Sequence, residues 1–150
     1  MNIQEVLKNK ANISIQKKVV LSIMYSHLKV MEKLSEVFKP YDLSPEQFNV
    51  LRILRGQYPD LAQMSLVQER MLTKNSNTTR LIDKLLLKKL VTRKVNEQNR
   101  RIVLVGITEA GLELLQELDK KVDIQENTMT KNLTEEELET INLLLEKLRD

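Results

Sequence analysis

The segment from Lys74 to Arg101 changes its hydrophobic period once, from the period of a helix to that of a strand. Its first half places apolar residues one, three and four positions apart, which gathers them on one helix face: Leu81, Ile82, Leu85 and Leu86. After Leu90, residues 91–95 and 102–107 alternate on either side of the short tip NEQNRR, as the two strands of a hairpin do. This order predicts a helix followed directly by a β-hairpin.

The same segment is strongly basic. It holds nine Lys and Arg side chains against two acids, Asp83 and Glu97, although the whole chain carries a net charge of only +3. Residues 109–150 hold twelve acidic and five basic side chains, so a phosphate backbone would be attracted to the middle of the chain and repelled by its end. A basic helix joined to a basic hairpin is the outline of a winged helix; the alternative is a solvated charged face.

The chain before this segment is predicted to be helical. Residues 14–38 repeat apolar positions at spacings of three and four, the pattern of a helix that packs along another helix: Val20, Met24, His27, Met31, Leu34 and Phe38. Pro40 ends that helix, and Ser44 followed by Pro45 is typical of the start of the next, which ends near Gly56. A short helix over residues 65–71 precedes the basic helix, and together they make a helix-turn-helix.

Two further helices are predicted after the hairpin. Thr108 before Glu109 is typical of an N-cap, and Thr134 with Glu137 has the spacing of a capping box. Both helices carry leucine-rich stripes, more than one small core needs. We infer that the N-terminal and C-terminal helices meet a second copy of the chain; packing of three helices within one chain is the alternative.

Length and composition exclude several classes of protein. The 150 residues fit one domain, 1–150, mainly α with a small β-hairpin. There is no signal pattern and no apolar run long enough for a membrane span, so a soluble, cytoplasmic protein is expected. No cysteine and one histidine argue against a metal site, and three glycines leave no phosphate loop, so we expect no cofactor and no enzymatic activity. Three Tyr, two Phe and no Trp offer little stacking for single-stranded nucleic acid.

The run NTTRLIDKLLLKKLVTRKVNEQNRRIVLVGITEAGLELL resembles the signature of the multiple antibiotic resistance regulator (MarR) family. The run covers about a quarter of the chain, and the helix order outside it agrees. The resemblance implies a winged helix-turn-helix lobe at about 44–108, with dimerisation helices at about 14–38 and 109–150. It also implies a homodimer on a pseudo-palindromic operator in double-stranded DNA, and a repressor released by a small aromatic or anionic effector. A dimeric winged-helix scaffold that binds another protein, without specific DNA binding, is the alternative.

DNA-binding roles are expected for three groups of residues. The resemblance, carried over by position, assigns the start of the recognition helix to the major groove: Asn75, Ser76, Asn77, Thr78, Thr79 and Arg80. The basic pattern of the segment itself indicates a second group that faces phosphate: Lys84, Lys88, Arg93 and Lys94. Arg101 at the wing tip would enter the minor groove, with Arg100 beside it on phosphate. Arg80 would also brace the wing, unless it is solvated or pairs loosely with Asp83.

Two positions depart from the family pattern. The family usually has Asp where this chain has Asn99, and that carboxylate commonly pairs with the recognition-helix arginine, so a neutral or absent brace and a looser wing are expected. The family favours Gly where this chain has Lys89. A left-handed backbone there would cost a lysine about 1 kcal/mol relative to glycine, so either that strain is tolerated or the turn differs.

A candidate effector site lies on the first long helix. His27, with Met24 and Met31, falls between the expected dimer base and the DNA-binding lobe, where the family binds ligands. The alternative is a packed histidine. The methionines, with Met64 and Met71, could equally fill the core.

Overall fold

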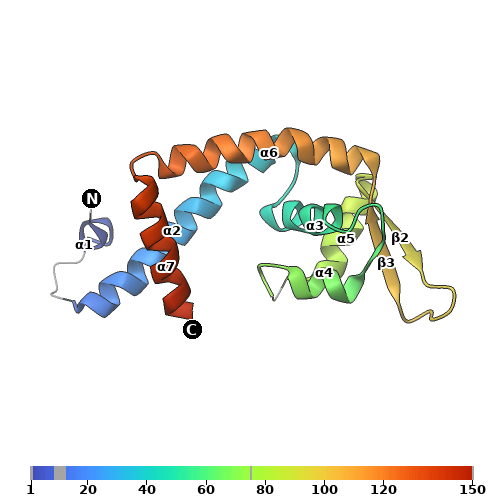
Figure 1. Ribbon diagram of the computed structural model, residues 1–150, viewed down its shortest axis with the longest axis horizontal. Helices are drawn as coiled ribbons and strands as arrows, with labels where there is room; N and C mark the ends of the chain where they lie inside the picture. Colours follow the sequence, from blue (N-terminus) through green and yellow to red (C-terminus); the bar gives the residue numbers. More distant parts are fainter. Residues whose placement is uncertain (1, 9–12, 75, 150) are drawn as a thin grey trace.

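The computed structural model describes residues 2–8, 13–74 and 76–149, which form one winged-helix lobe carried by long helices (Figure 1). The lobe contains α3 (Pro45–Arg55), α4 (Met64–Arg70), α5 (Thr78–Leu87) and the strands β1 (Ala62–Gln63), β2 (Val91–Val95) and β3 (Val103–Ile107). The remaining elements are α1 (Ile3–Val6), α2 (Ile15–Phe38), the 3₁₀ turn η1 (Lys39–Tyr41), α6 (Glu109–Thr130) and α7 (Glu135–Arg149). The predicted mainly helical class and the order of the long helices are confirmed.

Local capping explains where the long helices begin. Ser14 caps α2, and Thr108 caps α6 by accepting from the backbone of Gly111 at 3.1 Å. Ser44 and Gln47 form a reciprocal capping box at the start of α3, with 2.8 and 3.2 Å bonds. Thr134 forms the same box with Glu137 before α7, as its spacing predicts. The short helix α1, which is too short to show a helical pattern in the sequence, also begins with a capping box.

The β-structure is larger than the predicted hairpin. β2 and β3 pair antiparallel as expected, but β1 pairs with the other edge of β3, giving the order β1-β3-β2. β1 has two residues, too few to show an alternating pattern, and its pairing partner lies some forty positions away along the chain. The helix after it starts at Met64 and ends at Arg70, one residue earlier at each end than predicted.

One apolar core holds the lobe and joins it to α6. It takes fully buried side chains from α3, α4, α5, β3 and α6, among them Leu51, Val67, Ile82, Val105, Leu115 and Leu118. The start of α6 approaches the lobe so closely that a Cβ on Gly111 would lie 2.4 Å from the backbone oxygen of Leu90. Glycine is therefore required there for close packing.

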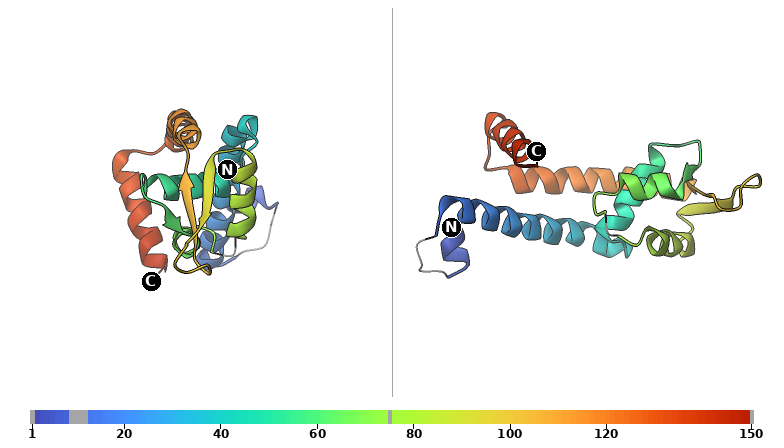
Figure 2. Two further views of the ribbon diagram at one scale, coloured as in Figure 1. Left: turned by 90° about the vertical axis from the view of Figure 1, so that its right-hand side faces the viewer. Right: turned by 90° about the horizontal axis from the view of Figure 1, so that it is seen from below.

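The helices outside the lobe form an elongated arm. α2 and α6 contact each other near the lobe and diverge away from it, and α7 turns back from the far end of α6, near the N-terminus (Figures 1 and 2). No residue of α7 is buried. Along the described part of the chain, no helix has both the length and the apolar composition to cross a membrane.

The helix α5 ends in a Schellman motif. The backbone N–H of Lys89 donates to Leu86 at 2.9 Å, and that of Leu90 donates to Leu85 at 3.1 Å. Lys89 has φ 58°, so the backbone is left-handed at this position and the strain on a lysine is tolerated.

Replacing Lys89 with glycine is expected to stabilise the fold. Relief of the left-handed penalty of about 1–2 kcal/mol exceeds the cost of about 0.5–1 kcal/mol for ordering a glycine. We expect a gain of about 0.5–1 kcal/mol in the free energy of unfolding, measured by urea denaturation. Lys120→Gly, in the interior of α6, is the matched control and should lose about 1 kcal/mol. A lower stability of Lys89→Gly would contradict this account of the turn.

Candidate nucleic-acid interface

The start of α5 presents polar side chains in two directions. Asn77 is the N-cap, and its side-chain oxygen accepts from the backbone of Arg80 at 3.1 Å. Asn77 and Thr79 are exposed and Ser76 is half-buried, whereas Thr78 is 3% exposed and its hydroxyl donates to Gln68 of α4. The helix thus begins at Thr78, and Asn75 lies outside the described residues. Three polar residues therefore line the outer edge of the start of α5, which we call the reading edge: Ser76, Asn77 and Thr79.

The predicted phosphate-facing set separates into paired and unpaired cations. Lys88 donates to Asp42 at 2.6 Å, with the lysine side chain 27% exposed and the aspartate 95%. The Lys88 ammonium holds the pKa of the Asp42 carboxyl below its usual value. Arg93 pairs with Asp83 at 2.6 Å, and Lys94 lies 3.8 Å from Glu97. Within the described residues, Lys84 forms no ion pair, so it is the cation of this set most available to a ligand.

The wing is joined to α5 without a brace from Arg80. The side chain of Arg80 makes no hydrogen bond or ion pair with any residue that the structure describes, which is one of the two outcomes expected with asparagine at position 99. Arg93 of β2 and Asp83 of α5 supply the link instead, between half-exposed side chains. Asp83 therefore pairs with Arg93 and not with Arg80.

Asparagines hold the tip of the wing. The side-chain oxygen of Asn96 accepts from the backbones of Gln98 and Asn99 at 2.9 and 3.1 Å. The side-chain oxygen of Asn99 accepts from the backbone of Arg101 at 3.1 Å. Such bonds to the backbone two or three residues ahead stabilise turns. Asn99 therefore shapes the turn that carries Arg101, and both Arg100 and Arg101 are exposed there.

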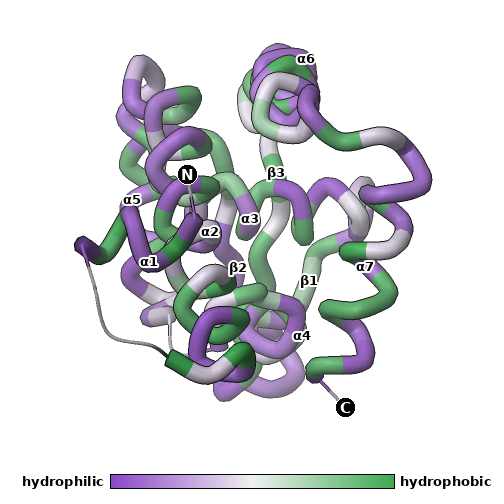
Figure 3. Tube along the Cα trace, turned by 90° about the vertical axis from the view of Figure 1, so that its left-hand side faces the viewer, coloured by the Kyte–Doolittle hydropathy of each residue, from purple (hydrophilic) through white to green (hydrophobic). Residues whose placement is uncertain are grey.

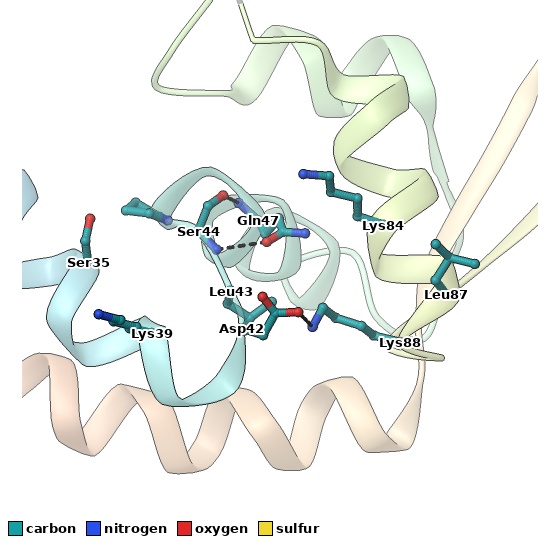
Figure 4. Close-up of a pocket in the computed structure, with 10 residues that line it drawn as sticks. Ser35, Lys39, Asp42, Leu43, Ser44, Gln47, Lys84, Leu87 and Lys88 are labelled. Carbon is teal, nitrogen blue, oxygen red and sulfur yellow. Dashed lines mark hydrogen bonds and ion pairs between the residues drawn. The ribbon is translucent and has the colours of Figure 1, made fainter.

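An open pocket of about 680 Å³ lies between the end of α2, the start of α3 and the end of α5 (Figure 4). Lys84 and Lys88 reach it from α5, and Asp42, Ser44 and Gln47 reach it from the other side. Gln47 is 4% exposed, and its amide nitrogen points toward α5 while its oxygen is held by the backbone of Ser44 (Figure 4). The pocket combines cations, an amide donor and the positive end of α3, a combination that suits an anion.

The effector residues proposed from sequence lie elsewhere. Met24 and His27 are exposed on α2, Met24 by 59%, and Met31 is half-buried. None of the three lines the two pockets described for this chain. The pocket lined by Lys84 and Lys88 could not be predicted from sequence patterns, because its walls come from segments about 45 positions apart in the sequence.

Polar contacts fix the lobe against α6. Arg55 of α3 donates to Asp119 at 2.5 Å, and Tyr58 donates to Glu109 at 2.8 Å. Tyr41 donates to Glu117, which lowers the pKa of that carboxyl. The contacts from Arg55 and Tyr58 thus tie the lobe to α6 in addition to the core, and the contact from Tyr41 ties η1 to the same helix.

Comparisons with known proteins agree with this geometry. The family model described as "MarR family" matches residues 43–103. The chain is 32% identical to the multiple antibiotic resistance protein MarR of Escherichia coli over 119 residues, covering 77% of this chain and 79% of that protein. It is 29% identical to the HTH-type transcriptional regulator MhqR of Bacillus subtilis over 134 residues, 87% of each.

The structural likeness extends over nearly the whole chain. A crystal structure of a mutant of E. coli MarR complexed with operator DNA superposes with a TM-score of 0.75 at 26% identity. The match covers 91% of this chain and 99% of that chain. The fold, the matched residues and the sequence identity agree, and the chain belongs to the MarR family of winged-helix transcription regulators.

Proposed function

We propose that this chain is a sequence-specific regulator that binds double-stranded DNA through the start of α5 and the tip of the wing. The observation that carries the proposal is the reading edge together with exposed basic side chains: Ser76, Asn77 and Thr79 at the start of α5, and Arg100 and Arg101 at the tip of the wing. Short polar side chains at a helix N-terminus suit base edges in the major groove, and an arginine suits a narrow minor groove. The related E. coli MarR mutant is complexed with operator DNA in its crystal structure, which supports the same kind of partner here.

The regulator acts as a homodimer in this proposal. α2 and α7 expose apolar side chains at the same end of the arm: Ile15, Val20, Met24, Leu28, Ile141, Leu144 and Leu148. Figure 3, which views that end, shows hydrophobic and hydrophilic residues alternating along α7. Surfaces of this kind mark protein interfaces. A two-fold pair would present two reading edges to half-sites about 10 base pairs apart.

Selection of bound fragments from random duplex DNA tests the proposal. We expect enrichment of one pseudo-palindromic sequence, with the logarithm of the binding constant falling linearly as the logarithm of salt concentration rises. The unpaired cations contribute to the steepness of this fall. Lys88 and Arg93 contribute less as long as their ion pairs with Asp42 and Asp83 are intact. A protein-binding scaffold predicts no enriched sequence, and such a result would refute specific recognition.

A small organic anion is the effector proposed for the Lys84 and Lys88 pocket. A carboxylate there would accept from Lys84 and from the amide of Gln47, and it would compete with Asp42 for Lys88. The volume falls within the range of small-molecule sites, about 300–1,000 Å³. An effector bound at this place would release DNA only if it binds the DNA-free conformation more tightly.

Replacing Lys84 with alanine is expected to weaken binding of benzoate, the simplest aromatic carboxylate, about tenfold, because one charge-assisted hydrogen bond is lost. Isothermal titration with the DNA-free protein measures this change. Lys120→Ala, which removes an exposed lysine from α6 outside the pocket, should bind benzoate like the parent chain. Equal affinities in all three proteins would remove the pocket from the mechanism.

A further inference from the structure

The connection between α4 and α5 is unusually long for a helix-turn-helix. It runs from Met71 to Asn77 and contains no glycine, whereas the usual turn has about three or four residues and often includes one. A longer connection leaves more ways to place the next helix, because each added residue brings its own backbone freedom. Something other than a tight turn must therefore fix the position of the reading edge.

Side-chain bonds to the described residues of the connection supply that constraint. Gln68 of α4 donates through its amide nitrogen to the backbone oxygen of Lys74 at 2.9 Å. Its amide oxygen accepts from the hydroxyl of Thr78, the first residue of α5. Asn49 of α3 accepts from the backbone of Leu72 at 3.1 Å. One side chain, Gln68, thus contacts both the middle of the connection and the first residue of the recognition helix.

The hydrogen bond from Thr78 to Gln68 is important for the position of α5 because Thr78 is buried. Thr78 is 3% exposed, and a buried hydroxyl without a partner is costly, so α5 is held where Gln68 can satisfy it. The neighbours of Thr78 on either side, Asn77 and Thr79, are exposed members of the reading edge. A shift of α5 that broke the bond would move both of them together.

We infer that Gln68 is a positioning residue for DNA sequence recognition, which acts by holding Thr78 and the Lys74 carbonyl so that the reading edge is presented in one register. Gln68 itself does not touch the bases in this inference, which rests on the proposed function. Base discrimination depends on donor and acceptor placement within about 0.5 Å. Attraction to phosphate is long-ranged and tolerates a small shift of the helix. Loss of the network should therefore reduce specificity and leave non-specific affinity unchanged.

The test compares specific with non-specific DNA affinity in variants of the two bonded residues. Thr78→Val keeps the shape of the side chain but removes the hydroxyl, and we expect the ratio of specific to non-specific affinity to fall about tenfold. Thr78→Ser keeps the hydroxyl and should retain the parent ratio. Thermal unfolding of each variant, measured alongside, separates loss of specificity from loss of the fold.

A double-variant cycle decides whether the two residues act as one unit. Gln68→Leu combined with Thr78→Val replaces the polar pair with an apolar pair, which keeps a folded lobe without either bond. The double variant should lose no more specificity than Gln68→Leu alone, because the shared interaction is lost only once. The inference would be overturned if Thr78→Val kept the parent's ratio of specific to non-specific affinity. It would also be overturned if the loss of specificity in the double variant equalled the sum of the losses in the two single variants. A parent chain that selects no DNA sequence would instead refute the proposed function.

Discussion

Replacing Ile141 with aspartate is expected to convert the protein to a monomer and to lower its affinity for a two-half-site operator by about 10²–10⁴-fold. Ile141 lies near the middle of α7 on the apolar stripe and is 42% exposed in the single chain. A two-fold interface would bury the new carboxylate twice, once in each copy, and an unpaired buried charge is strongly destabilising. Separated lobes bind one half-site each and lose the effective concentration that the dimer provides.

Leu143→Asp is the matched control for this prediction. Leu143 is also a large apolar residue of α7 and is 63% exposed, but it points about 200° away from Ile141 around the helix. If only exposure mattered, Leu143 would be at least as sensitive to the change. We expect Leu143→Asp to remain dimeric in sedimentation equilibrium and to bind the operator normally. A dimeric Ile141→Asp protein with full operator affinity would place the interface elsewhere.

Features encoded by neighbouring residues are predictable from the sequence. Ser44 is the N-cap of α3 and Thr134 forms a capping box with Glu137, as the sequence predicts. The change of period after α5 locates β2 and β3, because alternation is visible within five residues. The left-handed backbone at Lys89 is different, because the sequence alone leaves open whether the turn there is left-handed or of another kind.

Features that join distant segments are not predictable in the same way. A basic residue on a helix face has the same appearance in sequence whether it meets phosphate or an acid from another element. Lys88 pairs with Asp42, which lies 46 positions away in the sequence, and only the folded structure brings the two side chains together. The type and position of Thr78 favour the DNA surface, yet its hydroxyl faces Gln68 across the helix-turn-helix.

The stripe on α2 illustrates a second limit of sequence patterns. Val20 and Met24 have the helical spacing of buried residues, and Phe38 at the end of the same stripe is indeed buried in the lobe. Periodicity identifies an apolar face, but it does not say which surface covers that face. The same pattern therefore serves the core at one end of α2 and an exposed surface at the other.

Replacing Arg101 with alanine is expected to weaken specific operator binding by about 1–3 kcal/mol, or roughly 5- to 150-fold, without unfolding the protein. Arg101 is exposed at the wing tip, and its backbone N–H is held by the side chain of Asn99. Asn96 and Asn99 hold the turn at the wing tip, and Arg93 ties β2 to α5, so the strand that leads to the tip is joined to the helix of the reading edge. An arginine in a narrow minor groove gains from the concentrated negative potential there.

Fluorescence anisotropy with operator and scrambled duplexes measures the effect, and Arg100→Ala provides the comparison. Arg100 is expected to contact phosphate, so its loss should weaken both duplexes about equally and reduce the salt slope by about one. Arg101→Ala should instead affect the operator more than the scrambled duplex. Arg101→Lys keeps the charge but lacks the planar guanidinium, and it should recover the non-specific affinity without the full specific affinity. If Arg101→Ala lost the same affinity for both duplexes, Arg101 would be a phosphate contact. If it lost affinity for neither, the wing tip would take no part in DNA binding.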